Sequence, residues 1–130
     1  MNEIKKSSTG DFPLRLTPRN YRNQREALYG KDIRGEIIFL IRRLLFRGEP
    51  SRQKIAKELN LSVRTLQRSL SEMNTSYKDL LESTRKKLAL EYLKESEFTV
   101  AQTAVLLGYT ETSQFYKAFR RWYNHSPREL

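Results

Sequence analysis

Residues 55–76 read IAKELNLSVRTLQRSLSEMNTS, and residues 103–126 read TAVLLGYTETSQFYKAFRRWYNHS. The two stretches match in residue type when one residue is inserted in the second copy after its turn, and one more before its last three residues. The matched positions are Ala56 with Ala104, Leu59 with Leu107, Asn60 with Gly108, Leu61 with Tyr109, Ser62 with Thr110, Leu66 with Phe115, Arg68 with Lys117 and Leu70 with Phe119. The chain therefore contains an internal repeat.

Each matched position has a physical role in a helix-turn-helix unit. A small residue such as Ala allows the first helix to cross the second closely, and Gly or Asn tolerates the positive φ of the turn. Apolar residues at helical spacing then anchor the inner face of the second helix. One match of this kind arises easily by chance, but two in series rarely do. The repeat therefore predicts two tandem helix-turn-helix units.

The chain has helical periodicity almost throughout from Gly35 onward, and no strand-like alternation competes with it. Ser51, Ser62 and Thr99 are typical N-caps for the helices that follow them. We expect helices at about 36–47, 52–59, 63–73, 77–95, 100–107 and 111–123. The predicted fold is all-α, with a first helix-turn-helix at 51–74, a linker helix at 77–96 and a second helix-turn-helix at 99–123.

The first part of the chain, residues 1–34, differs from the rest because it contains prolines and glycines and has no sustained helical period. We interpret it as a linker or N-terminal arm, partly disordered, with a short helix around 19–29, and we expect the compact domain at 35–130. Phe39 and Phe46 lie on the side of the first helix opposite its apolar face. They are expected to pack on the arm, or else on a sensing domain or a second subunit.

The formal net charge is +10, from 25 Lys and Arg residues against 15 Asp and Glu residues. Such a surplus favours an anionic polymer or surface as the partner, although it is also compatible with a merely soluble basic protein. No apolar run approaches the length of a membrane-spanning helix, and residues 1–11 lack the apolar segment of a signal peptide. We therefore expect a cytoplasmic protein with no membrane partner.

The chain has no cysteine and a single histidine, His125. This composition excludes disulfides and cysteine-ligated metal sites, and it leaves a histidine-rich metal site or a Ser-His-Asp triad without its usual partners. The sequence also has no phosphate loop, nucleophile elbow or pair of catalytic carboxylates. We expect neither an enzyme nor a metal or cofactor site.

The expected linker helix has a length that suits DNA. A helix of roughly 19 residues is ~28 Å long, and successive major-groove openings on one face of B-DNA are about 34 Å apart. A rigid linker could hold the second helix of each unit in adjacent grooves. Because the two units differ in sequence, the DNA site is expected to be asymmetric.

Three segments carry a family resemblance: SVRTLQRSL at 62–70, LLGYTETSQFYKAFRRW at 106–122 and HSPREL at 125–130. Together they resemble the DNA-binding domain of the AraC/XylS family of bacterial regulators, and the resemblance covers residues 50–130. The family usually has Gly where this chain has Asn74 and Asn124. Asn is the next-best residue for a left-handed helix C-cap, so we expect the geometry to be preserved.

The resemblance implies about seven helices and sequence-specific binding to double-stranded promoter DNA, usually with activation of transcription. RNA polymerase would then be a further partner. Relatives often carry a separate sensing or dimerisation domain, for which this chain has no room, so it is expected to be a fragment unless it is a small stand-alone member. The alternative function is that of a non-specific nucleoid-type DNA-binding protein, which the charge alone would allow.

The outward residues of the two second helices are the candidates for reading bases. In the first unit they are Arg64, Thr65, Gln67 and Arg68, and the resemblance implies base contacts at the two arginines and the glutamine. Arg suits the O6 and N7 of guanine, and Gln suits the N6 and N7 of adenine. The second unit offers shorter or less geometrically specific side chains: Thr112, Ser113, Gln114, Tyr116 and Lys117. For the first unit the alternative is a polar helix face that contacts only solvent, and for the second unit it is a helix that reads less sequence and contacts more of the DNA backbone.

Phosphate contacts are expected from helix N-termini and from nearby cationic or hydroxyl side chains. The candidates are Arg52, Ser62, Lys86, Lys87, Thr110, Arg120 and Arg121. The alternative for the basic turn at 85–87 is contact with solvent alone. Trp122 has helical spacing with Phe115 and Phe119, which indicates a core residue rather than a base-stacking one.

Overall fold

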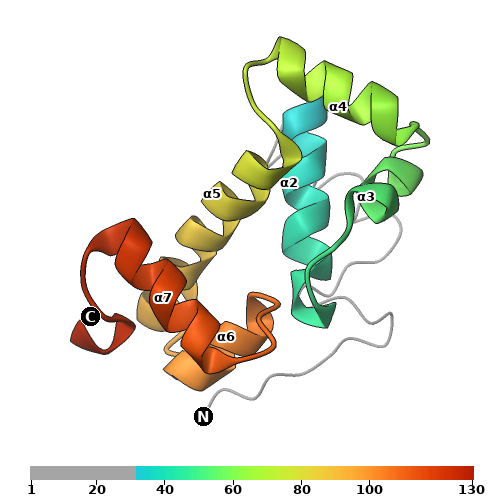
Figure 1. Ribbon diagram of the computed structural model, residues 1–130. Coiled ribbons are helices and arrows are strands. Elements are labelled where there is room, and N and C mark those ends of the chain that lie inside the picture. Colours follow the sequence, from blue (N-terminus) through green and yellow to red (C-terminus); the bar gives the residue numbers. More distant parts are fainter. Residues whose placement is uncertain (1–31) are drawn as a thin grey trace.

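The computed structural model describes residues 32–130, and within them every regular element is helical (Figure 1). The predictions of an N-terminal arm at 1–34, of its short helix and of its partial disorder concern residues that lie almost wholly outside the described range. The elements are α2 (Ile33–Leu44), a 3₁₀ turn η1 (Leu45–Arg47), α3 (Arg52–Glu58), α4 (Val63–Glu72), α5 (Tyr77–Leu90), a π-helical turn η2 (Glu91–Glu95), α6 (Val100–Leu106), α7 (Thr112–Tyr123) and a 3₁₀ turn η3 (Pro127–Glu129). The all-α, tandem helix-turn-helix prediction is confirmed.

Side-chain caps determine where most of these helices begin. The hydroxyls of Ser51 and Ser62 accept hydrogen bonds from the backbone N–H groups of Lys54 and Thr65, as the sequence predicted. Thr99 and Gln102 form a reciprocal capping box at the start of α6. Each cap satisfies a backbone donor that the first helical turn leaves without an intrahelical partner.

The start of the first helix and the end of the linker helix differ from the prediction. The first helix begins at Ile33, not near residue 36, because the carboxylate of Asp32 accepts a hydrogen bond from the N–H of Gly35 at 2.8 Å. A domain boundary between residues 34 and 35 would therefore cut through α2. The linker helix is α-helical only to Leu90, and its last turn is π-helical, with the N–H of Ser96 bonded to the carbonyl of Glu91 at 2.9 Å.

The two helix-turn-helix units lie at opposite ends of α5 (Figure 1). One unit is α3 with α4, the other is α6 with α7, and α2 packs along α5 between them. The largest fully buried side chains come from both units and from the helices between them: Phe39, Phe115, Phe119, Ile37, Ile41, Leu45, Ile55, Leu66, Leu70, Leu88 and Leu106. A single core therefore supports both units. No helix in the described range 32–130 combines the length and apolar character needed to cross a membrane.

Phe39 and Phe46 are both covered, although the sequence placed them away from the apolar face. Phe39 is 1% exposed, and Phe46 is half-buried against the core. The expected contact of these rings with the arm involves residues outside the described part of the chain.

Candidate nucleic-acid interface

The second helix of the first unit, α4, has one buried and one exposed face. Leu66 and Leu70 are fully buried, whereas Arg64, Gln67 and Arg68 are exposed. Within residues 32–130, these three exposed side chains make no hydrogen bond or ion pair. Two long cationic side chains and one amide are therefore available on the same surface for an external partner.

Thr65 differs from the other three candidates on α4. It is half-buried, and its hydroxyl accepts a hydrogen bond from the N-cap hydroxyl of Ser62 at 2.9 Å. The Ser62 oxygen also accepts from the backbone N–H of Thr65 at 3.0 Å. These two residues therefore stiffen the start of α4.

The second helix of the second unit, α7, also has one buried and one exposed face, but its side chains at the matching exposed positions are less suited to paired hydrogen bonds with bases. Phe115 and Phe119 are fully buried and take the places of Leu66 and Leu70. Counted from the N-caps Ser62 and Glu111, the positions of Arg64, Thr65, Gln67 and Arg68 are held by Ser113, Gln114, Tyr116 and Lys117. At these four matched positions α7 therefore has one cation, Lys117, where α4 has two.

Several candidates on α7 are already held by neighbours. The side-chain oxygen of Gln114 accepts from Thr110 at 3.1 Å, and the hydroxyl of Ser113 donates to Glu111 at 3.4 Å. The hydroxyl of Tyr116 accepts from Nε of Arg128 at 2.7 Å. Thr112 and Lys117 are exposed and have no side-chain hydrogen bond or ion pair within residues 32–130. Most of this surface is therefore preorganised by contacts within its own unit.

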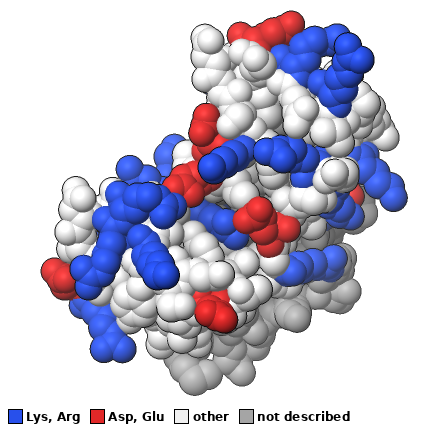
Figure 2. Space-filling model, viewed as in Figure 1, with Lys and Arg blue, Asp and Glu red and all other residues white. Residues whose placement is uncertain are grey.

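Cationic side chains gather over both units on one face of the molecule, with acidic side chains between them (Figure 2). Arg52, Lys86, Lys87 and Arg120 are all exposed. The ammonium of Lys86 lies 5.3 Å from the centre of the Tyr123 ring, which partly orients that side chain. This distribution suits a polyanion that runs past both units.

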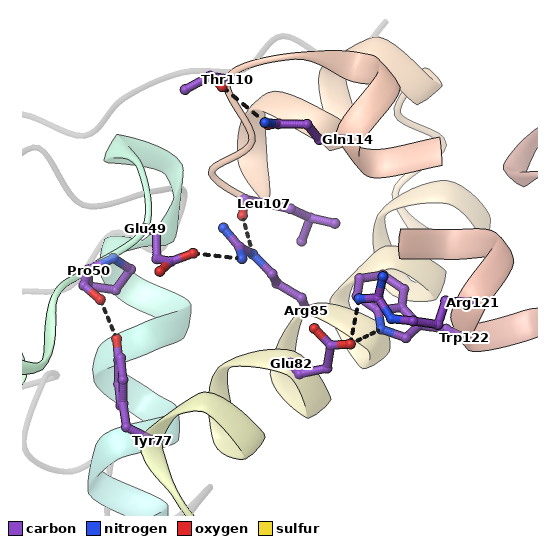
Figure 3. Close-up of polar contacts among 10 residues, drawn as sticks. All are labelled: Glu49, Pro50, Tyr77, Glu82, Arg85, Leu107, Thr110, Gln114, Arg121 and Trp122. Atoms are coloured by element: carbon purple, nitrogen blue, oxygen red, sulfur yellow. Dashed lines mark hydrogen bonds and ion pairs between the residues drawn. The ribbon is translucent and has the colours of Figure 1, made fainter. Parts of the chain in front are cut away.

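Glu82 on α5 docks α7 through two hydrogen bonds (Figure 3). Its Oε2 accepts from Arg121 at 2.6 Å and from the indole N–H of Trp122 at 2.9 Å. Burial tends to raise the pKa of Glu82, but the two hydrogen bonds and the positive charge of Arg121 outweigh it, so this pKa lies below its usual value. Trp122 is half-buried against the core, in keeping with the packing role that its spacing indicated.

Arg85 is a buried cation that sequence reasoning missed. It was grouped with Lys86 and Lys87 as a basic turn for phosphate or solvent, but it is only 7% exposed. Its Nε donates to the carbonyl of Leu107 at 2.8 Å and its Nη1 to the carboxylate of Glu49 at 3.0 Å (Figure 3). A usable signal existed, because residue 85 lies four positions after Leu81 and three before Leu88, on the buried face of α5.

The helix-turn-helix domain family matches residues 55–130 of this chain. The chain belongs to the AraC/XylS family. It is 37% identical over 101 residues to the ornithine utilization regulator of Pseudomonas aeruginosa. The match covers 75% of this chain and 30% of that protein. It is 40% identical over 93 residues to the regulator VirS of Mycobacterium tuberculosis. That match covers 72% of this chain and 27% of VirS.

A solved structure of the same kind supports the assignment. The crystal structure of a DNA-binding transcriptional dual regulator from Escherichia coli K-12 has a TM-score of 0.69 and 31% identity, over 76% of this chain and 88% of that one. The chain spans less than a third of the length of the two regulators compared above. It is therefore a helix-turn-helix module like those that AraC/XylS regulators carry.

Both departures from the usual AraC/XylS pattern keep the expected backbone. Asn74 and Asn124 stand where the family usually has Gly, and their φ angles are 58° and 63°. Asn124 is the left-handed C-cap of α7, with its N–H bonded to the carbonyl of Arg120 at 2.8 Å. Asn tolerates this conformation because its short polar side chain can hydrogen-bond locally.

Proposed function

We propose that this chain is the sequence-specific, double-stranded-DNA-binding module of a transcription regulator. In this proposal α4 and α7 enter adjacent major-groove segments on one face of the DNA. The observation that carries the proposal is the outward surface of α4, where Arg64, Gln67 and Arg68 are exposed and have no partner within residues 32–130. Side chains of these types form paired hydrogen bonds with base edges.

The two units would contribute unequally to sequence recognition. Arg64 and Arg68 would bind guanine through O6 and N7, and Gln67 would bind adenine, while Thr65 would offer its methyl group to thymine. Each good paired contact discriminates against a wrong base by about 1–3 kcal/mol. The second unit would read through Thr112, Ser113, Gln114, Tyr116 and Lys117, several of which are held by neighbours. The box bound by α7 should therefore carry less information.

Contacts with phosphates would position the module without reading sequence. We assign them to exposed hydroxyls near helix starts, Ser62 and Thr110, and to the cations Arg52, Lys86, Lys87, Arg120 and Arg121. Arg120 has no side-chain hydrogen bond or ion pair within the described range, whereas Arg121 is already paired with Glu82. The contribution of Arg121 should be the smaller of the two.

In the intact regulator, we propose, the module acts on promoter DNA in the cytoplasm and activates transcription together with RNA polymerase. The ornithine utilization regulator and VirS are each more than three times longer than the region matched here. A sensing or dimerisation domain would occupy the remainder of such a protein, and the residues before Asp32 would link it to the module that begins with α2.

Selection of bound sequences from random duplex DNA at about 150 mM salt tests the proposal. Wild type should select an asymmetric motif with two boxes about one helical turn apart. The double variant Arg64→Ala, Arg68→Ala should lose information in one box only. A matched control, Lys57→Ala with Lys94→Ala, removes the same charge from exposed positions outside the interface and should leave the motif unchanged.

Absence of any motif, together with equal binding by wild type and the double variant, would refute the proposal. That result would favour non-specific, nucleoid-type binding, in which salt dependence dominates and specificity is absent. A sequence-specific module should instead prefer its site over random DNA by ~10³ or more.

A further inference from the structure

The guanidinium of Arg85 contacts three residues, which lie in two separate parts of the molecule. Arg85 extends from α5 and donates to the carbonyl of Leu107, the C-cap residue of α6 just before the turn of the second unit. It also donates to Glu49, in the loop that precedes the first unit. Its Cζ lies 4.4 Å from the centre of the Tyr109 ring, within the range of a cation–π contact. One side chain therefore joins the linker helix to the second unit and to the loop that leads into the first unit.

The backbone of the second unit also comes close to the segment between α2 and the first unit at this place. A Cβ on Gly108 would lie 2.8 Å from the carbonyl oxygen of Leu45, 3.1 Å from the carbonyl carbon of Gly48 and 3.2 Å from the nitrogen of Glu49. The turn of the second unit therefore lies in close contact with the loop that leads from α2 to the first unit.

A third contact holds the same loop on its other side. The hydroxyl of Tyr77, a buried residue at the start of α5, donates to the carbonyl of Pro50. Residues 48–50 are thus hydrogen-bonded to α5 at Tyr77 and again at Arg85 (Figure 3). The turn at Gly108 lies against the same residues. We call residues 48–50 the junction loop, because movement of one unit against the other would have to break these contacts.

Charge attraction alone does not account for a buried arginine here. Desolvating a guanidinium is costly unless its donors are satisfied, and the side chain of Glu49 is 58% exposed, so solvent weakens their attraction. The specific property of Arg is its rigid planar fork, which donates in fixed directions to separate acceptors. The carbonyl of Leu107 and the carboxylate of Glu49 are such a pair.

We propose that Arg85 is a positioning residue that sets the rotation and distance between α4 and α7, and so determines which spacing of two DNA boxes the chain accepts. This inference rests on the proposed function for its DNA consequence, but the geometry of the free protein tests it independently. Two linked binding units gain ~10²–10⁴ in affinity when both can engage, and they lose this gain when the geometry forbids it.

The first test measures affinity for two-box DNA whose spacer changes in single base pairs around the selected length. The affinity of wild type should fall at least ~10-fold when one base pair is added to or removed from the spacer. Arg85→Met retains the apolar stem of the side chain but removes every hydrogen-bond donor. Its affinity at the best spacer length should therefore be lower, and its affinity should change less than ~3-fold over the same range of spacers. Glu49→Gln should flatten the profile in part. Lys78→Met removes an exposed charge from the same helix and should keep the wild-type preference.

The second test needs no DNA. The chain has no cysteine, so spin labels can be attached at Lys57→Cys and Val105→Cys, which are exposed and equivalent positions on α3 and α6. The distance distribution between the labels should be narrow in wild type and broader in Arg85→Met. Circular dichroism and thermal unfolding identify a variant that fails to fold, and in that case Glu49→Gln supplies both readouts.

The outcomes separate the two ideas. An unchanged spacer profile and an unchanged label distribution in folded Arg85→Met would overturn the role of Arg85, whether or not wild type reads two boxes. If wild type selects no motif, the proposed function fails, and a broadened label distribution in Arg85→Met would still establish that Arg85 fixes the two units.

Discussion

Asn60 and Gly108 occupy the same position in the two turns, with φ angles of 58° and 83°. Their surroundings differ. Asn60 is exposed, whereas a Cβ at Gly108 would meet the backbone of residues 45–49 at 3.2 Å or less. A positive φ explains both residues, but only the close approach of two backbones explains why the second turn has glycine.

The crowding at Gly108 predicts that the two turn positions do not tolerate exchange equally. Gly108→Asn should lower the free energy of unfolding by about 2 kcal/mol, because its side chain must displace backbone atoms. Asn60→Gly should change the same quantity by only a few tenths. Urea unfolding of both variants measures this. Similar small changes at both positions would mean that the junction loop yields easily.

A second residue-scale contrast concerns two threonines of α6. Thr103 is fully buried, and its hydroxyl has no hydrogen-bond partner in the described residues, whereas the matching residue of the first unit is Ile55. Thr99 is the N-cap of α6 and forms the capping box. The same substitution by valine therefore removes an unsatisfied group at one position and a cap at the other.

Thr103→Val should raise the free energy of unfolding by roughly 1 kcal/mol, because a buried hydroxyl without a partner retains its desolvation cost. Thr99→Val should lower it by a similar amount, since the N–H of Gln102 loses its acceptor. Chemical denaturation of the two variants side by side measures the sign of each change. A loss of stability in Thr103→Val would show that the hydroxyl finds a partner in solution.

At the scale of elements, α7 is attached to α5 through a carboxylate as well as through its apolar face. Glu82 lies between Arg121 and Trp122, and its pKa is lowered because these hydrogen bonds outweigh the opposing effect of burial. A carboxyl group with a lowered pKa in the folded state stabilises the fold above its unfolded-state pKa. That contribution disappears as the pH falls through the folded-state pKa.

Glu82→Gln should therefore destabilise the chain at pH 7, by at most about 1 kcal/mol because the site is partly exposed. The difference from wild type should shrink as the pH falls below the unfolded-state pKa and through the lowered folded-state pKa of Glu82, where the carboxyl of wild type becomes protonated too. Thermal unfolding from pH 7 to 3 measures the effect. Glu95→Gln, at an exposed position without an ion pair among the described residues, is the control. A difference from wild type that stays constant with pH would contradict this role of Glu82.

At the scale of the whole molecule, neighbouring arginines on α7 should differ in their value for DNA binding. Arg120 has no side-chain partner within residues 32–130, whereas Arg121 is 2.6 Å from Glu82 and would have to leave this ion pair to reach a phosphate. The fold as a whole therefore decides how many of its surplus cations are available to a polyanion.

The salt dependence of binding measures this difference. Arg120→Ala should reduce the slope of log K against log salt by about one and weaken binding evenly across DNA sequences. Arg121→Ala should reduce the slope by clearly less. Equal slopes for the two variants would indicate that Arg121 abandons Glu82 when DNA binds.

Much of the architecture could be predicted because it depends on local chemistry. The caps Ser51, Ser62 and Thr99 and the repeated apolar spacing of Leu66, Leu70, Phe115 and Phe119 each act within a turn or two of helix. The candidate base-reading residues of α4 could be predicted for the same reason, since the exposed face of a helix follows from its buried face. Asp32, which extends α2 beyond the expected start, is a local signal that was overlooked.

The sequence by itself thus determined the helices, their order and the two tandem units, because periodicity and capping are encoded within short segments. Only the tertiary structure decided that Arg85 is a buried connection, that Arg121 is paired and that Gly108 lies against the backbone of residues 45–49. These features depend on residues far apart in the chain: 22 positions separate Arg85 from Leu107, and 39 separate Arg121 from Glu82. Whether a charge faces solvent or a partner is fixed by what packs against it, and that packing exists only in the folded molecule.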